Sequence, residues 1–154
     1  MESAIDVESI AARFVTTLPH LVATGISLES VSVGRCVLRM GYQDHLVGDP
    51  ASGVLHGGAV TTLIDSAFSL AVLTAMPAPG PVATLDLRID YLRPAAPKRM
   101  LRADGHCFKL TRHIAFVRGF AYQDDPQDPV AAAQGSFLIS PLAGGARARG
   151  GQPL

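Results

Sequence analysis

The stretch from residue 58 to residue 76 constrains the fold most, because it predicts a helix that is apolar on almost every side. Asp65 is its only charged residue, and Leu, Ile, Ala, Val and Phe residues surround it in the sequence. Pro77 and the prolines that follow it do not allow the helix to continue. A helix that is apolar on most sides must be covered on most sides, and a curved antiparallel sheet wrapped around it is the economical cover.

The segments on either side of this helix supply the strands. Residues 25–42 predict two short strands joined by a turn or bulge at Gly34-Arg35. After the helix, four more runs of strand-forming residues are separated by turn residues. Their ranges are Val82–Leu92, Met100–Leu110, His113–Gln123 and Val130–Ile139, with turns at Thr111-Arg112 and Asp124–Pro129. We therefore expect an α+β fold.

The strand Val82–Leu92 shows the clearest alternation. Its odd-numbered residues from Ala83 to Tyr91 are apolar and predict one face. Asp86, Arg88 and Asp90 predict a polar face, which is either solvated or an intersubunit charge ladder. An open sheet leaves a free edge, and pairing two such edges across a two-fold axis would build a dimer.

The ends of the chain have a different character. Residues 5–18 predict a short amphipathic helix, which Pro19 is expected to end. We expect one domain over residues 1–142 and a flexible tail over residues 143–154. The N-terminus has neither the basic start nor the apolar core of a signal peptide, so the expected location is the cytoplasm.

Charge and spacing argue against several classes of partner. With 13 basic and 13 acidic residues, the chain has no basic field to hold nucleic acid. Cys36 and Cys107 lack the spacing of a metal site, and so do the histidines. Residues 58–76 approach the length of a membrane span, but Asp65 and five Ser or Thr residues favour a buried helix. We expect no metal, no cofactor, no nucleic acid and no membrane partner.

The residues at the start of the apolar helix predict chemistry. In His56-Gly57-Gly58, two adjacent glycines allow close approach of another group and leave backbone N–H donors free. The helix dipole adds to the attraction of these donors for an oxygen that carries negative charge. Asp65, nine residues after His56, is a carboxylate that would be costly to bury without purpose. Donors and a carboxylate base together favour acyl-transfer chemistry.

Two motifs carry a resemblance to a known family. The pattern Gly53-x-x-His56-Gly-Gly-x-x-x-x-Leu63-x-Asp65, in this order of elements, resembles the hotdog-fold acyl-CoA thioesterases of the phenylacetyl-CoA (PaaI-like) type. The strand from Thr84 to Tyr91, followed by Arg93-Pro94-Ala95, is similar to the family's first long strand after the helix. The likeness covers about residues 20–140.

This resemblance implies an assembly and a substrate. Such proteins are homodimers or dimers of dimers, with active sites at the subunit interface. The Gly-Gly helix start comes from one chain and the Asp-bearing helix from the other. The substrate is an acyl thioester of coenzyme A, which is hydrolysed to a free carboxylic acid and coenzyme A.

The residues then receive expected roles. Asp65 activates water or attacks the thioester directly, and the Gly57 N–H polarises the carbonyl, an effect worth about 3–4 kcal/mol in known oxyanion holes. His56 is expected to fix the helix start or touch substrate, and Thr84 to orient the water. The expected substrate-binding residues are Asp49, Gly58, Ile64 and Phe68 along the acyl group and its carbonyl, and Arg112 and His113 near the phosphates of coenzyme A.

One position departs from the family pattern. Several relatives carry an Asn six residues before the His, where it helps to hold the acyl carbonyl or the water. Pro50 occupies that position here, and Asp49 precedes it. Either Asp49 takes over the polar role through a shifted loop, or this chain lacks that group.

Other interpretations of the same residues stay open. Asp65 could be a helix carboxylate capped by nearby hydroxyls such as Thr61 or Thr62. The chain could bind acyl-CoA without turnover, as a sensing module on the same fold. It could also be a hotdog dehydratase or hydratase, which would need a His paired with an acid in a different arrangement.

Overall fold

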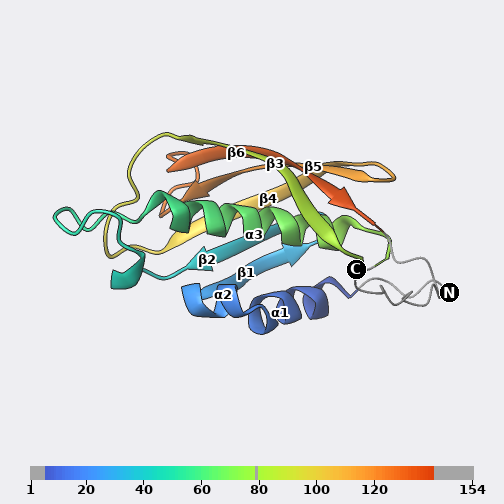
Figure 1. Cartoon of the computed structure of the whole chain (residues 1–154), viewed down its shortest axis with the longest axis horizontal. Helices are drawn as coiled ribbons and strands as arrows, with labels where there is room; N and C mark the ends of the chain where they lie inside the picture. Colours follow the sequence, from blue (N-terminus) through green and yellow to red (C-terminus); the bar gives the residue numbers. More distant parts are fainter. Residues whose placement is uncertain (1–5, 79, 141–154) are drawn as a thin grey trace, which may run out of the picture.

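The computed structural model describes residues 6–78 and 80–140 (Figure 1). The elements in chain order are α1 (Val7–Thr17), α2 (Pro19–Thr24), β1 (Ile26–Ser32), β2 (Arg35–Met40), the 3-10 turn η1 (Asp44–Leu46), α3 (Gly57–Ala75), β3 (Val82–Tyr91), β4 (Leu101–Leu110), β5 (Ile114–Tyr122) and β6 (Ala131–Ile139). The tail expected over residues 143–154 lies outside the described residues. All predicted strands are present, with ends shifted by one or two residues.

The six strands form one antiparallel sheet in the order β1-β2-β4-β5-β6-β3. Figure 1 shows α3 lying along one side of this curved sheet, with α1 and α2 below it. The predicted fold class, an α+β hotdog fold with one long apolar helix held by a curved antiparallel sheet, is confirmed. β1 and β3 are the two edge strands.

The core lies between α3 and the sheet. Leu63, Ile64 and Phe68 of α3 are fully buried there. The sheet comes so close to the helix that a Cβ on Gly105 of β4 would lie 2.7 Å from the Ala67 carbonyl oxygen. By length and composition α3 could cross a membrane, but 61% of its most apolar window is buried inside the molecule, so the sheet already covers it.

A second N-terminal helix corrects one expectation. Pro19 was expected to end helical structure, and it does end α1, but it also occupies the first turn of α2. Proline is compatible with this position because the first N–H groups of a helix have no partner within the helix. The backbone leaves α2 at Gly25, whose φ of 68° is the left-handed conformation that glycine adopts easily.

A bulge in β3 corrects a second expectation. The pairing of β3 with β6 shifts between Thr84 and Asp86, so the strict alternation predicted from Ala83 to Tyr91 does not hold through Leu85. Leu85 is 55% exposed, whereas Leu87 and Ile89 are half-buried against the core. The extra residue also turns the Thr84 side chain towards α3, where it reaches Asp65.

Replacing Phe68 by Ala tests the packing of α3. Phe68 is fully buried, so Phe68→Ala should lower the free energy of unfolding by about 3–5 kcal/mol in urea denaturation. The matched control is Phe120→Ala on β5, where the ring is 47% exposed and the expected loss is at most about 1.5 kcal/mol. Equal losses for the two variants would contradict this account of the core.

Candidate functional site

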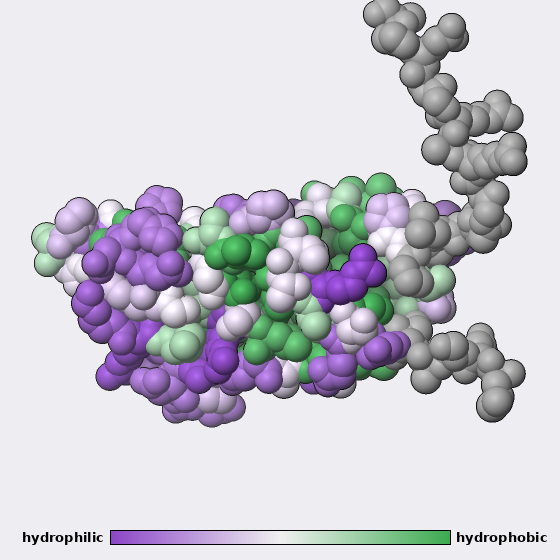
Figure 2. All heavy atoms as spheres, turned by 90° about the horizontal axis from the view of Figure 1, so that it is seen from below, coloured by the Kyte–Doolittle hydropathy of each residue, from purple (hydrophilic) through white to green (hydrophobic). Residues whose placement is uncertain are grey.

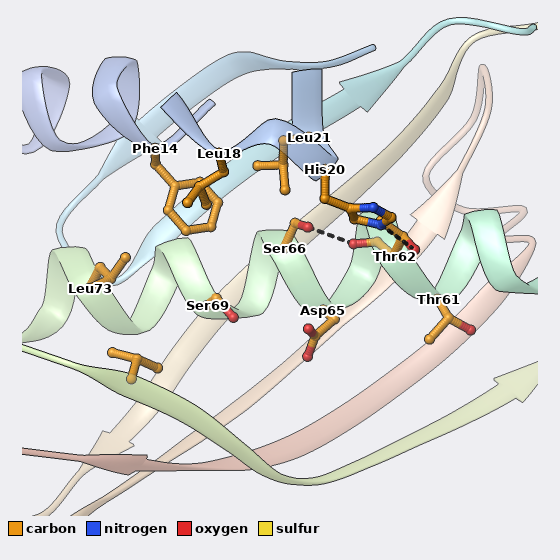
Figure 3. Close-up of a pocket in the computed structure, with 11 residues that line it drawn as sticks. Phe14, Leu18, His20, Leu21, Thr61, Thr62, Asp65, Ser66, Ser69 and Leu73 are labelled. Atoms are coloured by element: carbon orange, nitrogen blue, oxygen red, sulfur yellow. Dashed lines mark hydrogen bonds between the residues drawn. The ribbon is translucent and has the colours of Figure 1, made fainter. Parts of the chain in front are cut away.

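A cavity of about 440 Å³ lies between the N-terminal helices, α3 and the start of β3 (Figure 3). Its polar lining residues are His20, Thr61, Thr62, Asp65, Ser66 and Ser69, and its apolar ones are Phe14, Leu18, Leu21, Leu73 and Val82. Figure 2 views the molecule from below, the side of α1 and α2, and shows hydrophobic side chains gathered in the middle of this face. The cavity therefore has a polar side and an apolar side.

Asp65 and Thr84 meet at this cavity. Asp65 is half-buried, and its Oδ1 accepts a hydrogen bond of 2.9 Å from the Thr84 hydroxyl. Among the described residues, the Asp65 Oδ2 receives no hydrogen bond. In Figure 3 the carboxylate projects from α3 away from α2. One oxygen is thus held in place, while the other is available to a water molecule or a substrate atom.

The threonines near Asp65 have other partners. The Thr61 hydroxyl donates to the Gly57 carbonyl over 3.1 Å and lies 2.8 Å from the Tyr91 hydroxyl. The Thr62 hydroxyl lies 3.5 Å from His20 Nε2 (Figure 3). Neither threonine caps Asp65, so the interpretation of Asp65 as a carboxylate satisfied within its own helix does not describe this site.

The start of α3 has one free donor. The N–H of Gly58 donates to His56 Nδ1 over 2.8 Å, and a Cβ on Gly58 would lie 2.9 Å from that nitrogen. His56 therefore caps the helix with its own ring. Gly57 is exposed, its carbonyl accepts from the Tyr91 hydroxyl over 2.9 Å, and its N–H has no acceptor among the described residues. Of the two glycines, Gly57 is the one whose N–H can serve a ligand.

Gly57 and Asp65 of one chain are too far apart to act on one carbonyl group. They are eight residues apart on the same helix, which is about 12 Å along the axis at 1.5 Å per residue. An oxyanion donor and the group that attacks the same carbonyl must each come within about 3 Å of the reacting atoms. One chain thus holds both groups but does not bring them together.

The other predicted site residues lie apart from this cavity. Asp49 is exposed in the loop before the helix, where hydrogen bonds from the Ser52 hydroxyl and the Ala51 N–H lower the pKa of its carboxyl. Ile64 and Phe68 face the core, are fully buried and do not line the cavity. Arg112 and His113 are exposed in the β4–β5 turn, at the end of the sheet where the His113 carbonyl accepts from the Ile139 N–H.

Sequence reasoning did not assign a site role to His20, Tyr91, Ser66 or Ser69. Ser66 and Ser69 lie one and four residues after Asp65, and the spacing of four could have placed Ser69 on the same side of the helix. The contacts of His20 and Tyr91 join elements distant in the sequence, so no local signal predicts them. Within residues 6–78 and 80–140, no three His, Cys, Asp or Glu side chains gather as a metal site requires.

Comparisons with known proteins identify the family of the chain. Residues 52–130 match the family described as the thioesterase superfamily. A candidate esterase of Halobacterium salinarum is 35% identical over 144 residues, which cover 88% of this chain and 94% of that protein. The medium/long-chain acyl-CoA thioesterase YigI of Salmonella typhimurium is 27% identical, over 84% of this chain and 91% of that protein.

A solved structure extends the comparison to three dimensions. A mutant structure of the phenylacetic acid degradation protein PaaI from Thermus thermophilus superposes with a TM-score of 0.69 and is 28% identical. The superposition covers 79% of this chain and 98% of that chain. The resemblance to PaaI-like proteins that the sequence motifs carried is therefore confirmed.

The cap at the helix start can be tested by mutation. His56→Ala removes the acceptor of the Gly58 N–H and should lower the free energy of unfolding by about 1 kcal/mol. His56→Asn restores an acceptor at the cap and should recover most of this loss in urea denaturation. His45→Ala, at an exposed histidine with no hydrogen bond among the described side chains, is the control. If His56→Ala is as stable as His45→Ala, the cap contributes nothing.

Proposed function

The chain belongs to the thioesterase superfamily, and on that premise we propose that it hydrolyses acyl-coenzyme A thioesters. The products are a free carboxylic acid and coenzyme A. The observation that carries this proposal is the Asp65 carboxylate, held by Thr84 at the wall of a cavity with a polar and an apolar side. The name of the relative YigI, an acyl-CoA thioesterase, supports the choice of substrate.

Asp65 supplies the attacking group. With Oδ1 held by the Thr84 hydroxyl, Oδ2 either removes a proton from a water molecule or attacks the thioester carbonyl itself. Thr84 is then a positioning residue, because it orients the carboxylate and does not transfer a proton to substrate. His56 acts in the same way on the donor side, since its ring holds the first turn of α3 in place.

The Gly57 N–H is proposed to stabilise the oxyanion that forms on the carbonyl. Because Gly57 and Asp65 of one chain are about 12 Å apart along α3, the donor must come from a second copy of the chain. Each site then contains Asp65 of one subunit and Gly57 of its partner, and a homodimer contains two such sites. A dimer of dimers would keep the same pair of sites in each half.

The apolar wall is proposed to hold the acyl group. Phe14, Leu18 and Leu73 line the cavity beyond Asp65, so they replace Ile64 and Phe68 as the residues along the acyl chain. This wall suits the medium or long chains that the name of YigI describes. Arg112 and His113 are exposed, and they are proposed to bind the phosphates of coenzyme A.

One observation favours a second candidate function. His20 lines the same cavity as Asp65, and a histidine near an acid is what a dehydratase or hydratase on this fold would require. Enoyl-CoA substrates therefore belong in the same assay panel as saturated and aryl acyl-CoA substrates. Hydration without thiol release would favour that second function.

Asp65→Asn is the direct test of the hydrolase. The amide cannot act as a general base, so kcat/KM for thiol release should fall by about 10²–10⁴ across the acyl-CoA panel. Asp125→Asn is the matched control, because the exposed Asp125 carboxylate lies in the β5–β6 turn, where it accepts from the Gln127 N–H, and the variant should stay within a few-fold of wild type. Thiol release by Asp65→Asn at the wild-type rate would contradict the proposal, as would a wild-type protein that cleaves no acyl-CoA.

A further inference from the structure

Tyr91, the last residue of β3, connects the edge of the sheet to the start of α3. Its hydroxyl donates to the Gly57 carbonyl over 2.9 Å and lies 2.8 Å from the Thr61 hydroxyl. Tyr91 is 52% exposed, so burial of the ring accounts for only part of its placement. Resting on the proposed function, we propose that Tyr91 is the positioning residue of the oxyanion donor. It fixes the direction of the Gly57 N–H and acts on the substrate only through it.

The peptide group between Gly57 and Gly58 is held at both ends. The Gly57 carbonyl and the Gly58 N–H belong to this one planar group. The Tyr91 hydroxyl donates to its carbonyl, and its N–H donates to His56 Nδ1 over 2.8 Å. Two side chains from different parts of the chain therefore restrict the rotation of this peptide plane, which adjoins the donor.

The first turn of α3 needs such support because residues 57 and 58 are both glycine. Glycine is the most flexible residue, and it weakens a helix relative to alanine. A Cβ placed on Gly57 would lie 3.5 Å from the Tyr91 hydroxyl oxygen, an ordinary contact, so close packing does not hold this residue. An oxyanion donor is effective when its direction is fixed before the reaction begins. Hydrogen bonds to the turn supply what packing does not.

Thr61 cannot replace Tyr91 in this role. The Thr61 hydroxyl also donates to the Gly57 carbonyl, over 3.1 Å. Two hydroxyl protons serve three contacts, so at most two of these contacts are hydrogen bonds at one moment. Thr61, however, lies one turn along the same helix and moves with it. Tyr91 comes from the sheet, so its hydrogen bond holds the helix start relative to the sheet.

The backbone that follows Tyr91 is itself anchored. The N–H groups of Leu92 and Arg93 both donate to the Val130 carbonyl, over 2.8 Å and 3.3 Å. The Arg93 guanidinium donates to the Asp128 carbonyl over 2.8 Å. The Tyr91 hydroxyl therefore projects from a fixed strand end, and the position of that strand end sets the position of the first turn of α3.

Tyr91→Phe tests the role, because it removes the hydroxyl and keeps the ring. Loss of a complete oxyanion donor lowers kcat by about 10²–10³, so a donor that is present but less well directed should lower kcat for thiol release about tenfold. KM should stay within about twofold of wild type, since the donor acts mainly on the transition state.

Tyr42→Phe is the matched control. The Tyr42 hydroxyl also donates to a glycine carbonyl, that of Gly53 over 2.8 Å, but in the loop before α3. This variant loses the same kind of hydrogen bond outside the proposed site. Its kcat and KM should both stay within about twofold of wild type.

Two inhibitors separate positioning from a general loss of stability. A trifluoromethyl ketone thioether of coenzyme A forms a hydrate that resembles the tetrahedral intermediate, whereas the matching methyl ketone resembles the substrate. Tyr91→Phe should bind the first about tenfold more weakly than wild type does and the second within about twofold. A variant that is merely less stable would lose affinity for both or for neither.

Hydrogen exchange of the Gly58 N–H measures the restriction of the peptide plane without any substrate. In Tyr91→Phe this amide should exchange about tenfold faster than in wild type, because one end of its peptide group is released. In Tyr42→Phe the Gly58 exchange rate should equal that of wild type.

The results for Tyr91 and for the reaction can be told apart. If Tyr91→Phe matches Tyr42→Phe in kcat and in the ratio of the two inhibition constants, Tyr91 does not position the donor, while thiol release by wild type keeps the proposed function. A tenfold rise in KM at unchanged kcat would also overturn the positioning role, because the hydroxyl would then bind substrate directly. A wild type that cleaves no acyl-CoA refutes the proposed function itself.

Discussion

The rigidity of α3 sets the geometry of this protein. The helix is apolar on nearly every side and is held against a six-stranded sheet that approaches within van der Waals contact at Gly105. Its first turn and its single carboxylate are therefore fixed about 12 Å apart along one axis. Because no bend or slide of a packed helix can close that gap, the proposed donor Gly57 and the proposed base Asp65 of one chain cannot act on the same carbonyl group.

Side chains of neighbouring elements hold both groups of the proposed site, the first turn of α3 and the Asp65 carboxylate. At the start of α3 the Gly58 N–H donates to the His56 ring, so Gly57 is the glycine whose N–H is available to a ligand. The Tyr91 hydroxyl donates to the Gly57 carbonyl. At the carboxylate, the bulge in β3 turns Thr84 inward to hold one oxygen of Asp65. The same strand thus contacts both groups of the proposed site, Asp65 through Thr84 and Gly57 through Tyr91.

Local sequence patterns predicted most of the fold, because the apolar residues recur with clear periods and prolines or glycines mark where the elements end. α3 and all six strands lie within one or two residues of their expected ranges. α2 was not expected, because Pro19 is as suitable for starting a helix as for ending one. The bulge at Leu85 has no glycine to mark it. Ile64 and Phe68 could not be assigned to core or cavity from sequence, because an all-apolar helix does not show which side faces a ligand.

The central claim is that each site combines Asp65 of one subunit with the Gly57 N–H of its partner. Gly57→Pro removes that N–H at the first helical position, where proline is tolerated and where His56 already has the extended backbone that precedes proline. The decisive measurement is thiol release by an equimolar, subunit-exchanged mixture of Asp65→Asn and Gly57→Pro, each inactive alone. Half of the dimers should be mixed and have one intact site, so the account predicts about a quarter of wild-type activity. No recovery after proven exchange would contradict it.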